Sequence, residues 1–259
     1  TAHNLAFVSI AKRYEGQAAK VAQGLWGAGQ MMFNKYLVIT PETINLRNRE
    51  EIFRLLRGLD PKRHLIHSEG ILDVLDHSSP TTGYGAKLAI DLTDIDLKRV
   101  PASLPAPRTA RPVGGVELFN TELTRETGLL ILYAEWEWHE TIDVERYLAE
   151  NNIEGIKYVA LFDRGAAGHM RASDLLWLAA ANTDPKRDIR LFGDVVIIDA
   201  RSKRPGYGNN PKRFPNVVTS STDTIHYVDE RWAEYGIGEL VESPSRRYRK
   251  LWLSEGAEW

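Results

Sequence analysis

Cysteine is absent from the 259-residue chain. Its absence excludes disulfides, thiolate metal sites and a cysteine nucleophile together. A chain without cysteine fits a reducing compartment, so we expect the protein to be cytoplasmic.

Long apolar runs and an excess of basic charge are absent as well. No run reaches the ~18–20 apolar residues that a membrane span requires, and no signal peptide is visible. The 33 basic and 35 acidic residues are interspersed and give a formal net charge of −2. We therefore expect neither a membrane span nor a nucleic-acid partner.

Short apolar runs and stretches of helical periodicity alternate along the first hundred residues. Strands are predicted over residues 5–10, 35–40, 64–69 and 87–92, and helices over 16–33 and 48–58. This alternation is typical of βαβ units around a mostly parallel sheet. Because the chain begins without Met and directly in a strand-like run, we expect it to be a piece of a longer polypeptide.

A proline-rich stretch divides the chain, and the strand pattern restarts after it. Residues 101–115 hold four prolines and two glycines, which predicts an extended connector. The runs "LLILYAEW" (129–136) and "KYVALFD" (157–163) then resemble "LAFVSIAK" and "KYLVITP" of the first part.

Shorter matches recur at nearly one offset. "DPKR" occurs at 60–63 and 184–187, "GYG" at 83–85 and 206–208, and "GILDVLD" (70–76) is similar to "GDVVIID" (193–199). Recurrence in one order predicts a tandem duplication, with the turn-rich loop around residues 76–85 present in each copy.

The expected fold class is therefore α/β, with two tandem βαβ-type units, each with a small mostly parallel sheet flanked by helices. The predicted boundaries are a first unit over 1–100, a connector over 101–118, a second and degenerate copy over 119–222, and a helical tail over 223–259.

Several local patterns suggest chemistry but have plainer explanations. "GLWGAGQ" (24–30) closes a helix instead of opening one, so we do not expect a phosphate site. His64 and His67 stand on a predicted strand and face opposite sides, which disfavours a shared metal. His139 in "EWEWHE" is a weak acid–base candidate. Asp73, Asp76 and Asp91 could assist proton transfer, although Asp beside Ser-Pro more often caps a turn.

Motifs in the first unit resemble the C-terminal domain of the UbiD-like carboxy-lyases, which are prenylated-flavin decarboxylases. The resemblance rests on "AKRYEGQAAKVAQGLW", "KYLVIT", "DPKR" and "LDVLDHSSPTTGYGAKLAIDLT", and the tail "VDERWAEYGIG" (228–238) resembles the C-terminal helix of that family. The matching positions include Lys12, Tyr14, Gly16, Lys20, Lys35, Asp60, Asp76, Ser79, Pro80, Gly83, Gly85, Lys87, Asp91 and Thr93.

The departures from the family pattern limit what the resemblance implies. The catalytic Arg and two Glu of the family belong to a preceding flavin-binding domain, and this chain has no EGPxG-type segment. Gln17 stands where the family motif has His. The resemblance thus implies prenylated FMN with manganese and potassium for a parent enzyme, and neither cofactor nor metal in this fragment. The inserted second copy suggests the menaquinone-pathway subgroup.

In the family, the strand and loop before "SP" face the substrate pocket. Position by position, the resemblance implies that the pocket is lined by Leu72, Asp73, Val74, Leu75 and His77. Alternation along a strand puts only half of such residues on one face, so core filling is the alternative for 72–75.

The expected function is the C-terminal domain of a non-oxidative decarboxylase that acts on an aromatic or quinone-precursor acid. This domain would supply a pocket wall and homo-oligomer contacts, and its partner would be the upstream flavin-binding domain of the same polypeptide. Alone it would be inactive. The alternative is a non-catalytic scaffold or dimerisation module, and a free-standing Rossmann-like nucleotide binder is disfavoured because "SIAKRYEG" offers one glycine.

Overall fold

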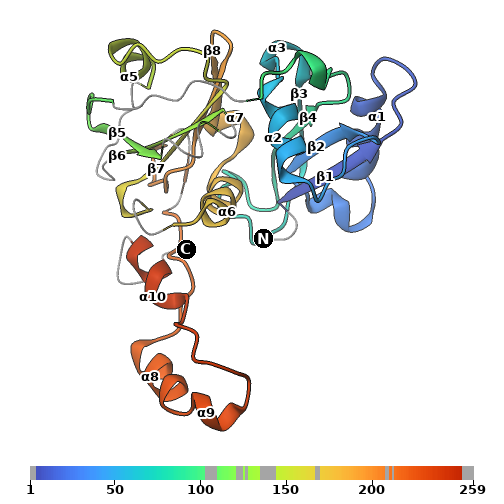
Figure 1. Ribbon diagram of the computed structural model, residues 1–259. Coiled ribbons are helices and arrows are strands. Elements are labelled where there is room, and N and C mark those ends of the chain that lie inside the picture. Colours follow the sequence, from blue (N-terminus) through green and yellow to red (C-terminus); the bar gives the residue numbers. More distant parts are fainter. Residues whose placement is uncertain are drawn as a thin grey trace.

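The computed structural model describes residues 4–102, 110–120, 125, 128–134, 144–166, 170–207, 210–211 and 213–252. They form two mixed α/β units whose sheets lie side by side (Figure 1), which confirms the expected fold class. No helix within these ranges is long and apolar enough to cross a membrane. The expected connector falls partly outside them.

The first sheet has the order β1-β2-β4-β3. Strands β1 (Leu5–Ile10), β2 (Tyr36–Pro41) and β4 (Tyr84–Asp91) are parallel, and β3 (Leu65–Ile71) is antiparallel to β4. The predicted strands are thus confirmed within a few residues.

Helices cover both faces of this sheet. Helix α1 (Gln17–Trp26) packs Ala18, Ala22 and Trp26 on one face, and α2 (Arg49–Arg57) packs Ile52 and Leu55 on the other. The sequence predicted one helix over 16–33, but α1 ends at Trp26 and a 3-10 turn, η1 (Gly29–Phe33), follows. Glycines at 24, 27 and 29 weaken helical continuation at this point.

The second sheet has the order β5-β6-β7-β9-β8. Strands β6 (Leu129–Ala134), β7 (Tyr158–Asp163) and β9 (Val195–Asp199) are parallel, whereas β8 (Ile189–Phe192) and β5 (Val116–Asn120) are antiparallel to their neighbours. Helices α5 (Val144–Glu150) and α6 (Ala172–Asn182) cover its two faces. Apart from β5, the strand order and directions equal those of the first sheet.

The repeated "DPKR" forms the same local structure in both units. Helices α3 (Pro61–His64) and α7 (Pro185–Asp188) each begin with proline and have Asp60 or Asp184 as N-cap. A side chain four residues on, His64 or Asp188, accepts the N–H of that aspartate. Proline at the first helical position and a capping aspartate explain why this tetrapeptide starts a short helix wherever it occurs.

The other two short matches do not correspond in the structure. Tyr36 pairs with Leu88 in the first sheet, and the equivalent Tyr158 pairs with Val196 in the second. "GDVVIID" is therefore the counterpart of β4 and not of residues 70–76. The turn-rich stretch of the second unit, described over 200–207, follows β9 and does not lie between β8 and β9. Gly193 and Asp194 alone join β8 to β9. The expectation of a loop in each copy was wrong, because apolar residues in a central strand resemble any other apolar run.

The two units contact each other through donor side chains at equivalent positions, Tyr36 and Tyr158 and then Lys62 and Lys186. The Tyr36 hydroxyl donates to Thr183 O (3.2 Å), and the Tyr158 hydroxyl donates to Leu56 O (3.0 Å). Lys62 pairs with Asp194 and Lys186 with Glu69, so the short helix of each unit reaches the hairpin of the other. One apolar cluster joins Val38, Ile52 and Leu55 of the first unit to Tyr158 and Val196 of the second. The shared strand order and the pseudo-twofold packing agree with a duplication, although the duplication itself stays a prediction.

The chain after the second sheet forms a tail of short helices. These are α8 (Thr222–Glu230), α9 (Trp232–Tyr235) and α10 (Ser245–Tyr248), followed by the 3-10 turn η5 (Arg249–Leu251). Helices α8 and α9 stand away from both sheets (Figure 1). Tyr248 anchors the base of the tail, because its hydroxyl donates to Asp174 of α6.

Candidate functional site

The candidate site is the segment between β3 and β4, of which residues 72–79 are called the pocket loop here. Aspartate side chains shape it: Asp73 Oδ1 accepts the N–H of Leu75, and Asp76 Oδ1 accepts that of Ser78, each at 2.9 Å. Such local bonds from a side chain to the backbone fix turns without hydrogen bonds to a neighbouring strand. Gly83 then has φ 75°, a region open to glycine, and turns the chain into β4.

The five residues expected in the pocket fall into four environments. Val74 and Leu75 are 65% and 72% exposed. Leu72 is 1% exposed and fills the core below them. The carboxylate of Asp73 is used in the loop's own turn. His77 points into the second unit, where its Nε2 lies 3.0 Å from Asn182 Oδ1 and its ring makes an edge contact with Phe214.

A buried ion pair fixes the base of the pocket loop. Lys35 Nζ lies 2.9 Å from Asp76 Oδ2 and 2.8 Å from Ser78 Oγ, and the Lys35 side chain is fully buried. Burial would raise the pKa of Asp76, but the Lys35 ammonium and the hydrogen bonds from Ser78 outweigh it and leave that pKa below its ordinary value. Burial also lowers the pKa of Lys35, opposed by Asp76, Asp184 and Asp188. The pair therefore ties the loop to the start of β2 as a charged unit.

A second buried amine lies next to this pair. Lys87 on β4 donates to Met32 O (2.7 Å) and Asn34 O (2.6 Å) and lies over the Trp26 ring. Burial lowers the pKa of Lys87 to about 8; Asp76 opposes this shift and Lys35 adds to it. Lys87 thus holds the segment between η1 and β2 through two backbone carbonyls. It lies at the same end of the sheet as the pocket loop.

Above this polar base the loop presents an apolar surface. The patch consists of Val74 and Leu75 together with Ile71 and Tyr84, which are opposite each other in the β3–β4 ladder and are both exposed. The site therefore combines a rigid, charged base with an uncovered apolar tip, an arrangement that suits the wall of an apolar pocket.

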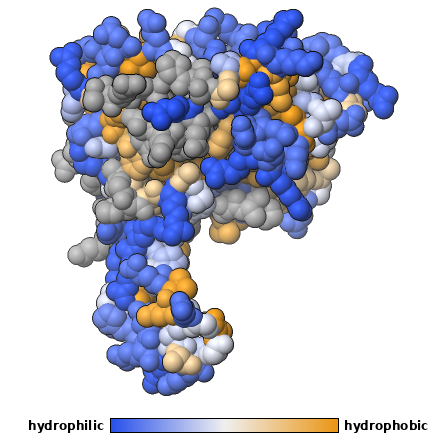
Figure 2. All heavy atoms as spheres, in the orientation of Figure 1, coloured by the Kyte–Doolittle hydropathy of each residue, from blue (hydrophilic) through white to orange (hydrophobic). Residues whose placement is uncertain are grey.

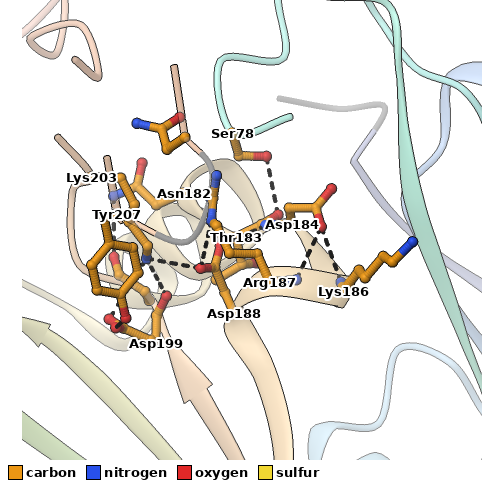
Figure 3. A network of polar contacts seen from close by, with 12 residues as sticks. Ser78, Asn182, Thr183, Asp184, Lys186, Arg187, Asp188, Asp199, Lys203 and Tyr207 are labelled. Carbon is orange, nitrogen blue, oxygen red and sulfur yellow. Dashed lines mark hydrogen bonds and ion pairs between the residues drawn. The ribbon is translucent and has the colours of Figure 1, made fainter. Parts of the chain in front are cut away.

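Residues of the second unit complete the base, and sequence reasoning missed them. Asn182, Thr183 and Asp184 join α6 to α7 and lie between Ser78 on one side and Asp188, Asp199 and Lys203 on the other (Figure 3). The sequence carries one hint: the second "DPKR" follows Asn-Thr, whereas the first follows Gly-Leu.

The second unit has its own charged cluster, at the carboxyl ends of β7 and β9. Arg201 binds Asp199 with two nitrogens (2.9 and 2.7 Å), and Tyr207 donates to the same carboxylate at 2.6 Å. Burial would raise the pKa of Asp199, but Lys203 and Arg201 outweigh it and hold that pKa well below its usual range. The Asp199 carboxylate is thus paired with Arg201 and Tyr207 inside the unit, so we interpret the cluster as a structural network and not as a binding site.

The described residues do not supply the ligands of a divalent metal. No group of three His, Asp or Glu side chains among them could hold one. His64 Nδ1 accepts the Asp60 N–H at 2.9 Å, and His67 stands on β3. His139 lies outside the described residues. No reaction step is assigned to manganese or potassium at this part of the chain.

The fold and the loop define the chain's first unit as a small α/β domain with an uncovered apolar loop. Its residues 1–92 match the family of 3-octaprenyl-4-hydroxybenzoate carboxy-lyase C-terminal domains. The resemblance expected from the sequence is therefore confirmed over these residues, which are about a third of the chain. The menaquinone subgroup stays a prediction.

Relatives match either the first unit or most of the chain. An uncharacterized protein of Aquifex aeolicus is 41% identical over 92 residues, which are 35% of this chain and 19% of that protein. An uncharacterized protein of Helicobacter pylori J99 is 28% identical over 242 residues, which are 88% of this chain and 37% of that protein. The chain thus spans about a fifth to somewhat more than a third of these relatives' lengths.

Solved structures of UbiD-class enzymes are also similar over part of the chain. The UbiD-class enzyme HmfF of Pelotomaculum thermopropionicum, in complex with FMN, is 25% identical with a TM-score of 0.32, covering 44% of this chain and 24% of its own. Vanillic acid decarboxylase of Sedimentibacter hydroxybenzoicus is 26% identical with a TM-score of 0.33, covering 43% and 24%.

Proposed function

We propose that the chain is the C-terminal part of a non-oxidative decarboxylase that acts on an aromatic or quinone-precursor carboxylic acid. The pocket loop forms an apolar wall that faces an upstream flavin-binding domain of the same polypeptide, in the cytoplasm. The observation that carries this proposal is the exposure of Val74 and Leu75 on a loop whose base is held by the Lys35–Asp76 pair.

The wall contributes through orientation and water exclusion. Apolar side chains hold a planar acid in place and remove water from the reacting carboxylate, which strengthens electrostatic interactions around it. The electron-sink chemistry belongs to the flavin of the parent enzyme. No residue of this chain is assigned to bond breaking.

The wall is tested by kinetics on the complete polypeptide. We expect Val74→Ser with Leu75→Ser to raise KM about tenfold or more for an aromatic acid substrate, because two apolar contacts are lost. Val218→Ser is the matched control, since Val218 is 96% exposed in the segment that leads to the tail. Equal kinetics for both variants would reject the wall.

The isolated 259-residue chain gives a second test. We expect it to decarboxylate no aromatic acid and to purify without flavin, because the catalytic groups implied by the family are not in it. Stoichiometric flavin in the purified chain, measured by absorbance after denaturation, would refute this part of the proposal.

The alternative, a scaffold or dimerisation module, is favoured by one feature of the tail. Ile237, Leu240 and Val241 are all more than half exposed, and Figure 2 shows apolar residues on the projecting tail. We propose that the tail also makes the homo-oligomer contact. Light scattering should then give a dimer or larger for the chain and a monomer after these three residues are changed to Ser.

A further inference from the structure

The second unit contacts the pocket loop through three consecutive residues, 182–184, called the brace here. The first contact is the pair His77–Asn182. Asn182 Nδ2 donates to Ala200 O at 3.2 Å, which turns Oδ1 toward His77. His77 Nε2 is then the donor of the 3.0 Å bond.

The second contact centres on the carbonyl of Thr183. Ser78 Oγ lies 3.1 Å from this oxygen, and the Tyr36 hydroxyl donates to it at 3.2 Å. Ser78 and Thr183 are both buried. Ser78 Oγ also lies 2.6 Å from Asp76 Oδ1, so the hydroxyl has one acceptor inside the loop and a second one in the second unit.

The third contact is made by Asp184. Its carboxylate caps α7 through the N–H groups of Lys186 and Arg187, and its Oδ2 also accepts the N–H of Ala86 at 3.2 Å. The approach is close: a Cβ on Gly85 would lie 3.1 Å from this oxygen and 2.8 Å from Ser79 Oγ. Glycine at 85 therefore lets the strand after the loop approach the brace.

We propose that the brace holds the pocket loop in the conformation that presents Val74 and Leu75, so that Asn182, Thr183 and Asp184 are positioning residues for the pocket. The role of Val74 and Leu75 as a pocket wall rests on the proposed function. The role of the brace in holding the loop does not depend on that function. The second unit is then a support for the loop of the first. Its own hairpin, closed by Gly193 and Asp194, has no loop that needs such support.

Amide hydrogen exchange on the full 259-residue chain tests this role directly. We expect Asn182→Ala and Asp184→Asn each to speed exchange of the amides of residues 76–86 about tenfold, since each removes a bond to that segment. Asp60→Asn is the matched control: Asp60 caps α3 as Asp184 caps α7, through the N–H of Lys62. It should leave exchange over residues 76–86 unchanged.

A double-mutant cycle separates a local bond from general destabilisation. His77→Phe keeps an aromatic ring beside Phe214 but removes the bond to Asn182. Because Asn182→Ala removes the same bond as well as the one to Ala200 O, loop exchange in the double variant should be no faster than in Asn182→Ala alone. The proposal is overturned if loop exchange is unchanged in both brace variants, if the Asp60 control speeds it equally, or if the cycle is additive. None of these outcomes depends on decarboxylase activity, so the failure of the proposed function would leave this test intact.

Discussion

The two units share strand order, strand direction and the capped "DPKR" helix, but only the first carries a loop between its antiparallel strand and the neighbouring parallel strand. The same framework therefore supports a candidate site in one unit and a closed two-residue hairpin in the other. Tyr36 and Tyr158, and Lys62 and Lys186, join the units from equivalent positions, whereas the residues around the site have no counterparts. The comparison places the candidate site in the loop between β3 and β4, which the second unit lacks between β8 and β9. The strands and "DPKR" helices that both units share hold this loop in place.

The largest difference is expected at the lysine that opens each "KY" strand. Lys35→Met should destabilise the fold by about 3–5 kcal/mol, because it leaves Asp76 buried without its counter-charge. Lys157→Met, at the equivalent position before β7, should cost no more than about 0.5 kcal/mol, since Lys157 is partly exposed. Urea unfolding measures both. Similar losses of unfolding free energy in the two variants would show that Lys35 and Lys157 stabilise the fold equally.

The next difference concerns Lys87, whose counterpart in the second sheet is Val195. Burial lowers the pKa of Lys87 to about 8, below its ordinary value. Between that pH and about 10.5 the unfolded chain binds this proton and the folded chain does not, so stability should rise with pH. The gain is on the order of 2 kcal/mol.

Lys87→Met tests that gain by subtraction. The difference in unfolding free energy between the wild type and this variant should increase in favour of the wild type from pH 8 to pH 10. If the difference in unfolding free energy stays constant from pH 8 to pH 10, the lowered pKa of Lys87 would be contradicted.

The smallest effect is expected where the units are most alike. Tyr36→Phe removes the contacts of one hydroxyl with Thr183 O and Oγ1, and Tyr158→Phe removes the bond of one hydroxyl to Leu56 O. Each substitution should cost about 0.5–1.5 kcal/mol. Thermal unfolding of the two variants should give nearly equal shifts. Strongly unequal shifts would break the pseudo-twofold relation between the two halves of the interface.

Local chemistry made much of the framework predictable. The strand positions followed from apolar runs. The short helices α3 and α7, which begin at Asp-Pro, were not predicted, although proline at the first helical position favours such a start. The family motif pointed to the segment that holds Val74 and Leu75, which are both exposed, while their place in a substrate pocket stays a prediction. These features are set by residues near one another in the chain.

The remaining features depend on contacts between distant residues. His77 meets Asn182 across 105 positions, and no local pattern marks that pair. The register of β9 was misread because its apolar residues resemble those of 70–76, and hydrogen-bonded pairing alone decides it. For the same reason the brace could not be inferred from the sequence.

The most direct measurement is radical footprinting of Leu75 in the isolated chain and in the complete polypeptide. Leu191, exposed on the hairpin of the second unit, serves as the reference. If the pocket loop faces an upstream domain, labelling of Leu75 relative to Leu191 should fall several-fold in the complete polypeptide. Equal labelling of Leu75 in the two proteins would contradict the account.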